Sequence, residues 1–240
     1  MNVLIVLPTY NERSNIERVT DAIMAHPWTR LLVVDDGSPD GTGAIADGLA
    51  QKYQGRIEVM HRTGARGLGL AYVDGLRRAL ASGVGVIGQM DADLSHDPIY
   101  LPDLRAGLAD HDLVIGSRYL HGVSVVNWPL HRIALSAFAN RYIRAITGLR
   151  PKDCTSGFRL WRREALATLP LDHARANGYA FLTEMLFEAA RRGCRIGEAP
   201  IVFVERREGH SKVSSKVLFE SLLTPWRLIL RGGRVRAPRP

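Results

Sequence analysis

The chain has 240 residues, 46% of them hydrophobic, which is enough for one large domain with a full core. Its formal charge of +8 is uneven: residues 212–240 carry seven basic side chains against one acidic side chain, so the rest of the chain is close to neutral. This near-neutral body argues against a nucleic-acid-binding protein, and two cysteines without CxxC spacing argue against a disulfide scaffold or a zinc site.

Strands and helices are predicted to alternate from the N-terminus onward. The first residues lack the basic start and long apolar run of a signal peptide and are expected to form a strand, and no apolar run reaches the roughly 18 residues of a membrane span. The predicted strands are 3–7, 31–34, 57–61, 84–90 and 113–117, and the predicted helices are 15–25 (with Asn15 as N-cap), 41–51, 70–82 and 101–109. This alternation predicts an α/β fold in a single domain, with a mostly parallel, doubly wound, Rossmann-like sheet.

Two aspartates, Asp91 and Asp93, follow the predicted strand 84–90, whose small and apolar residues indicate burial on both faces. Sheets of this kind bind ligands in the crevice at the carboxyl ends of their strands. Carboxylates this close repel each other unless a cation lies between them, and a hard cation such as Mg²⁺ or Mn²⁺ prefers carboxylate and phosphate oxygens. A solvated acidic turn is the alternative, and these residues alone do not decide between the two.

Polar clusters also follow the first two predicted strands, at residues 8–12 and 35–38. An aromatic ring such as Tyr10 can stack on a nucleotide base, and an acidic side chain can accept hydrogen bonds from ribose. Each cluster alone is better explained as a capped turn, but three clusters on strand ends favour a nucleotide-binding crevice. The glycine-rich loop 64–69 adds only weak support for a phosphate site.

With these motifs the chain resembles the family-two glycosyltransferases of GT-A fold, and among them the polyprenol-phosphate mannosyltransferases (dolichol-phosphate mannose synthases). The resemblance covers residues 2–212. Asp-Gly-Ser and Asp-Ala-Asp mark the wider group, whereas Asp-Ala-Asp-Leu-Ser-His and Phe-x-x-Arg-x-x-Gly-x-Ser-Lys mark the polyprenol-phosphate branch. The matching segments are 7–12, 34–42, 67–69, 90–96, 116–119, 155–160, 203–206 and 209–212.

The resemblance implies a role for each strand-end cluster. The first two acidic motifs would bind the nucleoside of GDP-mannose, through the five residues Pro8, Tyr10, Glu12, Val34 and Asp36. These positions contribute an aromatic ring, carboxylates and strand-end backbone.

The metal site follows from the same resemblance. Asp91 and Asp93, with the backbone of Ala92, would hold Mg²⁺ or Mn²⁺ against the diphosphate, where the ion neutralises the charge that grows on the departing GDP. Some relatives carry glutamine where this chain has Ser95. The shorter serine leaves open a direct Ser95–metal bond or one through water.

Cations are implied for the phosphate groups. Arg118, Arg132 and Ser136 would bind the acceptor phosphate, and the four-residue spacing of the last two places them on one face of an expected helix. Arg206 and Lys212, on the loop after the last strand, would close over the donor. Arg118 would also contact the donor. A planar guanidinium matches phosphate oxygens in pairs, although a surface cation is the usual state of an arginine. The residues implied to be catalytic are Asp91, Asp93, Arg118 and Arg206.

The implied reaction is an inverting transfer of mannose from GDP-mannose to a polyprenyl monophosphate. The same chemistry with UDP-glucose is the alternative, because the acidic motifs name neither base nor sugar. A silent nucleotide-sugar-binding scaffold and a basic lipid- or nucleic-acid-binding module are less consistent with the intact aspartate pair and the uneven charge. Because a phosphate monoester is already largely dianionic at neutral pH, Glu184 is expected to orient a cation rather than act as a base.

The C-terminal part is expected to lie outside the catalytic domain 1–212. Residues 213–231 show near-helical apolar spacing and predict an amphipathic helix, and 232–240 form a basic tail that is either membrane-bound or disordered. We therefore expect a peripheral enzyme on the cytoplasmic face of the membrane. The sequence leaves open whether a separate membrane-anchoring subunit is required.

Overall fold

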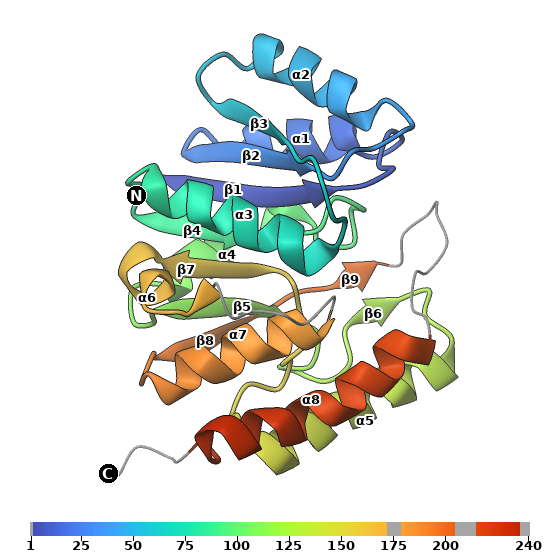
Figure 1. The fold of residues 1–240 in the computed structure, drawn as a ribbon, viewed down its shortest axis with the longest axis vertical. Coiled ribbons are helices and arrows are strands. Elements are labelled where there is room, and N and C mark those ends of the chain that lie inside the picture. The colour runs from blue at the N-terminus through green and yellow to red at the C-terminus, as the bar shows by residue number, and fades with distance from the viewer. Residues whose placement is uncertain (1, 172–178, 205–214, 236–240) are drawn as a thin grey trace.

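A sheet of seven strands runs through the part of the chain that the structure describes, and helices cover both of its faces (Figure 1). The structure is a computed structural model and describes residues 2–171, 179–204 and 215–235. The strand order is β3-β2-β1-β4-β7-β5-β8, and β6 pairs with β9 in a separate small sheet. The strands are β1 (Val3–Thr9), β2 (Thr29–Asp35), β3 (Ile57–His61), β4 (Val86–Gln89), β5 (Leu113–Ser117), β6 (Val125–Val126), β7 (Arg159–Arg162), β8 (Ile196–Pro200) and β9 (Phe203–Val204).

Most neighbouring strands are parallel, as the βα alternation predicts. β1 lies between β2 and β4, β2 pairs with β3, and β5 pairs with β8, all in parallel register. The sequence did not predict β7, which is antiparallel to both β4 and β5. The close packing of β4 depends on Gly88, because a Cβ there would lie 2.4 Å from Ile5 Cδ1 and 2.9 Å from Leu160 Cδ2.

The helices are α1 (Ile16–Met24), α2 (Thr42–Lys52), α3 (Leu68–Ala81), the 3-10 helix η1 (Pro98–Tyr100), α4 (Leu101–Gly107), α5 (Leu130–Thr147), α6 (Arg163–Ala167), α7 (Tyr179–Arg191) and α8 (Ser215–Gly232). Side chains of β1 point alternately to the two faces of the sheet. Leu4 and Val6 join a core with α3 and α7, whereas Val3, Ile5 and Leu7 join a core with α1 and α4. Because successive side chains of a strand point to opposite faces of the sheet, the strands contribute to two cores, one on each face.

Several predicted boundaries differ from the observed ones: β1 extends to Thr9, β2 spans Thr29–Asp35 rather than 31–34, and α4 ends at Gly107 rather than at residue 109. The strand expected over 84–90 is confined to Val86–Gln89, because the chain turns at the aspartates, and α3 begins at Leu68 rather than at residue 70. Asn15 occupies the N-cap position of α1 as predicted, but its side chain makes no capping bond and donates instead to Glu12 Oε2 at 2.9 Å.

Helices α5 and α8 lie side by side at one end of the sheet (Figure 1). α5 contains Arg132 and Ser136, and α8 covers most of the segment predicted to form an amphipathic helix. Tyr142 joins the two helices: its hydroxyl donates to the Leu222 carbonyl at 2.9 Å and accepts from Trp226 Nε1 at 2.8 Å. None of the helices in the described ranges is long and apolar enough to cross a membrane.

Candidate active site

The turn that follows β4 holds Asp91 and Asp93 in one fixed conformation. The Asp91 amide donates to His96 Nδ1 at 3.2 Å, and Asp93 Oδ1 accepts both from the Ser95 amide at 3.1 Å and from its hydroxyl at 2.5 Å. Between them Leu94 has a φ of +62°, a left-handed conformation that costs a residue with a side chain on the order of 1–3 kcal/mol. The hydrogen bonds on both sides of Leu94 hold the backbone in this strained form.

His96 is a structural part of the turn, because its Nδ1 accepts from the Asp91 amide. Its ring is buried, stacked on Phe158 at a centroid distance of 5.4 Å and edge-on to Phe203 at 5.6 Å. Because Nδ1 accepts from the Asp91 amide, the 3.6 Å approach of Asp91 Oδ2 to this nitrogen is not an ion pair. The buried and stacked ring therefore holds the turn in place.

The two carboxylates fit a divalent cation that is shared with a substrate. Within the described ranges no group of three or more His, Cys, Asp and Glu side chains could hold a metal alone. Mg²⁺ is typically bound by one or two carboxylates together with waters and phosphate oxygens. The turn would supply the two carboxylates, and water and a substrate phosphate would supply the other ligands. Asp91 and Asp93 would hold the ion, while the Ser95 hydroxyl is directed at Asp93; a Ser95–metal bond stays a prediction.

The end of β2 is built around two buried aspartates. Asp35 accepts from Thr9 and from the amide and hydroxyl of Ser38, so it closes the turn. Asp36 accepts from the Gly67 amide at 2.8 Å and from Arg62 Nη1. The predicted nucleoside-binding aspartate is therefore also the residue that ties the glycine-rich loop to the end of β2.

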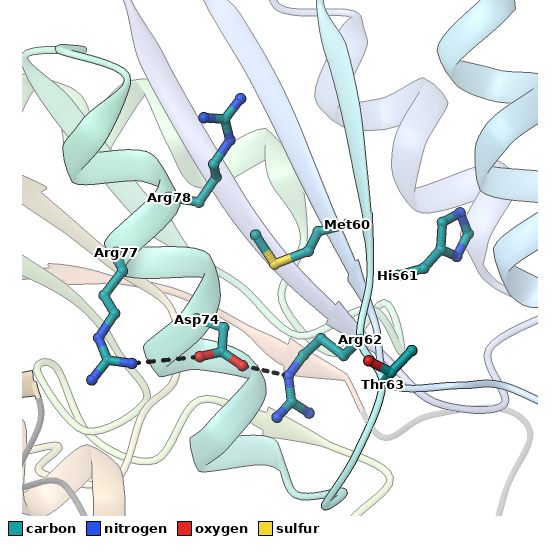
Figure 2. Close-up of a pocket in the computed structure, with 7 residues that line it drawn as sticks. All are labelled: Met60, His61, Arg62, Thr63, Asp74, Arg77 and Arg78. Carbon is teal, nitrogen blue, oxygen red and sulfur yellow. Dashed lines mark hydrogen bonds and ion pairs between the residues drawn. The ribbon is translucent and has the colours of Figure 1, made fainter.

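Arg62 connects this crevice to a pocket at the edge of the sheet, beside β3 and α3 (Figure 2). Its Nε donates to Asp74 Oδ2 at 2.7 Å, while Arg77 approaches the other oxygen of Asp74 at 3.7 Å. The pocket has a volume of about 490 Å³. It is lined by Met60, His61, Arg62, Thr63, Asp74, Arg77 and Arg78. The carboxylate of Asp74 thus balances the charge of Arg62 and Arg77, and the ion pairs of Arg62 hold it beside Asp36.

The other predicted nucleoside residues lie around the ends of β1 and β2. Tyr10 is half-buried and faces Arg66, whose guanidinium lies 5.1 Å from the ring centroid and donates to the tyrosine hydroxyl. The Glu12 amide donates to Thr42 Oγ1 at 3.0 Å. Tyr10 and Glu12 are therefore placed at the strand ends, as the sequence predicts.

Pro8 and Val34 are register partners in β1 and β2, and both are buried. The Val34 side chain is fully buried against Gly75 of α3, where an added Cβ would come within 2.8 Å of it. A nucleoside contact of Val34 could therefore involve its backbone but not its side chain. For both residues, contact with a nucleotide stays a prediction.

Arg118 at the end of β5 is paired with a buried carboxylate that sequence reasoning missed. Its Nε and Nη2 donate to the two oxygens of Asp153 at 2.6 and 2.7 Å, and Nη2 also donates to Thr155 Oγ1 at 2.8 Å. Burial alone would raise the pKa of Asp153, but the charge and hydrogen bonds of Arg118 lower it below its usual range. The pair fixes Arg118 at the end of the strand, and no spacing signal links two residues so far apart in the sequence.

The structure brings Arg118, Arg132 and Ser136 to one aromatic cluster. The guanidinium of Arg132 lies 4.3 Å from the Trp128 ring centroid, and that of Arg118 lies 5.8 Å from the same ring. Tyr119 donates to Ser136 Oγ at 2.7 Å. The Trp128 Nε1 atom is buried and has no hydrogen-bond partner among the described residues. Predicted site residues Arg206 and Lys212 lie outside the described residues.

Phe203 of β9 links this cluster to the aspartate turn. Its ring lies 5.4 Å from the Arg118 guanidinium and 5.6 Å from the His96 ring. Phe203 therefore contacts both His96, which supports the aspartate turn, and Arg118 of the aromatic cluster.

Comparison with known proteins finds relatives that are all glycosyltransferases by name or by family profile. The sequence profile described as "Glycosyl transferase family 2" matches residues 4–169. The chain is 43% identical over 236 residues to the polyprenol monophosphomannose synthase of Mycolicibacterium smegmatis, covering 98% of this chain and 89% of that protein. It is 43% identical to the undecaprenyl-phosphate mannosyltransferase of Micrococcus luteus over 243 residues, which covers 99% and 98% of the two chains. It is 36% identical to the dolichol-phosphate mannosyltransferase of Pyrococcus furiosus, covering 98% of this chain and 66% of that protein.

Among solved structures, glucosyl-3-phosphoglycerate synthase from Mycobacterium tuberculosis, in complex with Mn²⁺, UDP and glucosyl-3-phosphoglycerate, superposes with a TM-score of 0.66. The identity is 23%, and the match covers 98% of this chain and 81% of that one, so the likeness shows a common fold. The predicted GT-A architecture is confirmed. From the family profile and the near-full-length relatives, the chain belongs to glycosyl transferase family 2.

Proposed function

We propose that the protein transfers mannose from GDP-mannose to the phosphate of a polyprenyl monophosphate, with inversion at the anomeric carbon, giving polyprenyl phosphate mannose and GDP. The names of the three mannosyltransferase relatives support the sugar and the acceptor class. The observation that carries the proposal is that Phe203 contacts both the His96 ring, which supports the Asp91–Asp93 turn, and the Arg118 guanidinium. This arrangement supports a metal-bound diphosphate at the aspartate turn and a lipid phosphate at the arginine cluster.

The metal-binding residues act on the donor side. A divalent cation, Mg²⁺ or Mn²⁺, would stabilise the negative charge that develops on the departing GDP. Asp91 and Asp93 would hold that cation, and hydrogen bonds within the turn fix the Asp91 backbone and the Asp93 carboxylate before the donor arrives. Fixed charges of this kind cost no reorganisation during the reaction.

On the acceptor side, the site needs cations that bind a dianion, and it does not need a base that removes a proton. The second pKa of a phosphate monoester is about 6, so the nucleophile is already largely deprotonated at neutral pH. Arg118, Arg132 and Ser136 would bind it, and the Trp128 indole N–H, which has no hydrogen-bond partner in the part of the chain that the structure describes, could donate to one of its oxygens. Glu184 lies 3.6 Å from Arg231 of α8, which supports an ionic role for this carboxylate rather than that of a general base.

Binding of the donor is tested by thermal unfolding with GDP, GDP-mannose, UDP or UDP-glucose, each with and without Mn²⁺. At 100 times the dissociation constant a ligand stabilises the folded state by about 2.7 kcal/mol, which corresponds to roughly 5–10 °C for a chain of this size. GDP and GDP-mannose should produce such a shift in the presence of Mn²⁺. A larger shift with UDP-glucose than with GDP-mannose would favour the glucosyltransferase alternative.

We also infer that the outer surface of α5 and α8 rests on an anionic membrane. Five large apolar side chains on it are 48–84% exposed: Leu135, Phe138, Leu222, Trp226 and Leu230. Phe138 stacks on Tyr142, which bonds to Trp226, so the two helices present one continuous apolar strip, here called the α5–α8 face. An exposed strip of this kind is typical of a docking surface.

Basic side chains near the α5–α8 face support an anionic lipid surface as its partner. Exposed arginines on or just after the two helices are Arg141, Arg144, Arg227, Arg231 and Arg234. Each cation near an anionic membrane contributes about 1 kcal/mol, in addition to the burial of apolar side chains. Because Arg132 and Ser136 begin the same helix, a docked α5 would hold the acceptor site close to the lipid phosphate.

Replacing both Leu222 and Leu230, which are exposed in the structure, with serine should lower binding to anionic vesicles by about 100-fold or more, since each leucine that becomes buried in the membrane contributes about 1.5–3 kcal/mol. Transfer to a short acceptor dispersed in detergent should persist. The matched control is Ile99→Ser, because Ile99 is 67% exposed on η1, away from this face. Co-sedimentation with vesicles of phosphatidylglycerol measures the effect. If the double variant sediments as the wild type does, the α5–α8 face is not the membrane contact.

A further inference from the structure

Tyr72 of α3 places a buried hydroxyl on one of the two aspartates of the metal-binding turn. Its side chain is fully buried, and its ring stacks on Phe181 of α7 at a centroid distance of 6.0 Å and an interplanar angle of 11°. Its hydroxyl lies 2.9 Å from Asp91 Oδ1. The phenol thus reaches from the core between α3 and α7 to the rim of the site.

The hydrogen bond has a fixed direction. An ionised carboxylate only accepts, so the tyrosine hydroxyl must donate. The packed ring cannot turn away, which makes Tyr72 a permanent donor at a fixed position.

The opposite side of Asp91 is closed by backbone. A Cβ added at Gly157 would lie 3.3 Å from Asp91 Oδ2 and 3.4 Å from Oδ1, which leaves the carboxylate little room on that side. The loop before Gly157 is fixed by Arg159, whose buried guanidinium donates to the carbonyls of Ser156 and Leu182 at 2.8 Å and of Cys154 at 3.2 Å. The carboxylate nevertheless remains 35% exposed, so it opens toward solvent in one direction.

We propose that Tyr72 is the positioning residue of Asp91: its hydroxyl holds one carboxylate oxygen, so that the carboxylate is oriented for a divalent cation before the cation binds. The proposal rests on the proposed function in that it takes Asp91 as a metal ligand. Outer partners that orient a ligand in this way typically change metal affinity 10–100-fold when they are removed. None of the sequence motifs includes Tyr72, although the segment 67–69 begins the same helix.

The variant Tyr72→Phe removes only the hydroxyl, and its effect is read as binding rather than turnover. The affinity for Mn²⁺ at saturating GDP, measured by titration calorimetry, should fall about 10-fold or more. The affinity for GDP without metal should stay within twofold of the wild type. The matched control is Tyr53→Phe, which removes a tyrosine–aspartate bond of 2.8 Å between Tyr53 and Asp21, outside the site, and should leave Mn²⁺ binding unchanged.

Two results would overturn the proposal. One is an Mn²⁺ affinity in Tyr72→Phe within twofold of the wild type. The other is an equal loss of metal-dependent and metal-independent GDP binding, which would indicate a general structural role for the tyrosine. Failure of the proposed function looks different, because an absence of mannose transfer by the wild type leaves the comparison of Mn²⁺ affinities intact.

Discussion

Replacing Asp153 with alanine should lower the free energy of unfolding by about 3–5 kcal/mol, because it leaves a buried arginine without its counter-charge. The side chains of Arg118 and Asp153 are 6% and 0% exposed, and the pair is bidentate, at 2.6 and 2.7 Å. Breaking one side of such a pair costs more than the pair contributes, since the remaining charge stays desolvated. Denaturant unfolding at neutral pH measures the loss.

The pH dependence of this loss follows from the lowered pKa of Asp153. Burial acts to raise that pKa, but Arg118 outweighs it, so the folded-state pKa lies below the value in the unfolded chain, about 3.9. The stabilisation by the carboxylate is therefore fully present above about pH 4 and is lost as the pH falls through the folded-state pKa. The difference between wild type and variant should be constant from about pH 5 to 8 and shrink at lower pH.

The control for Asp153→Ala is Glu58→Ala, which breaks an ion pair with Arg78 whose members are 38% and 50% exposed and should change stability far less. Asp153→Asn keeps the shape of the side chain and should lie between wild type and alanine, which retains a comparison if the alanine variant does not fold. A loss for Asp153→Ala no greater than that for Glu58→Ala would contradict the account of this pair.

The parts of the site that the sequence predicts are those set by local order. Alternating strands and helices specify a parallel sheet, and the carboxyl ends of its strands meet at one edge. Residues that directly follow β1, β2, β4 and β5, such as Tyr10, Asp36, Asp91 and Arg118, therefore lie where their positions in the sequence predict. The strand Ile57–His61 and the strand Leu113–Ser117 have the predicted bounds for the same reason.

The parts that the sequence could not predict depend on contacts between distant segments. β7 inserts antiparallel between β4 and β5, and its neighbours are set by packing such as the bond from Trp161 Nε1 to Gln89 Oε1 at 2.7 Å. Asp153 lies 35 residues from its partner Arg118 in the sequence, and Tyr72 lies 19 residues from its partner Asp91. No periodicity encodes such pairs, because hydrogen-bond partners are chosen by the three-dimensional arrangement. The domain boundary at 212/213 stays a prediction.

Replacing Asp93 with asparagine should abolish mannose transfer. The asparagine oxygen can still accept from the Ser95 amide and hydroxyl, so the turn should keep its shape, but a neutral amide is a poor ligand for a hard cation. The loss should exceed the roughly 10–100-fold effect of removing an outer partner. The matched control is Asp97→Asn, because exposed Asp97 only caps η1, accepting from the Ile99 amide at 2.9 Å, and should retain activity.

The measurement that tests the central claim most directly compares a polyprenyl phosphate with the corresponding polyprenol as acceptor, using GDP-mannose, Mn²⁺ and either wild type or Asp93→Asn. An alcohol must lose a proton during attack, for which a positioned base contributes about 10²–10⁴-fold, whereas the phosphate has none to lose. The account predicts a mannolipid from the wild type with the phosphate alone, and none from Asp93→Asn with either acceptor. Transfer to the polyprenol as fast as to its phosphate, or near wild-type turnover by Asp93→Asn, would contradict it.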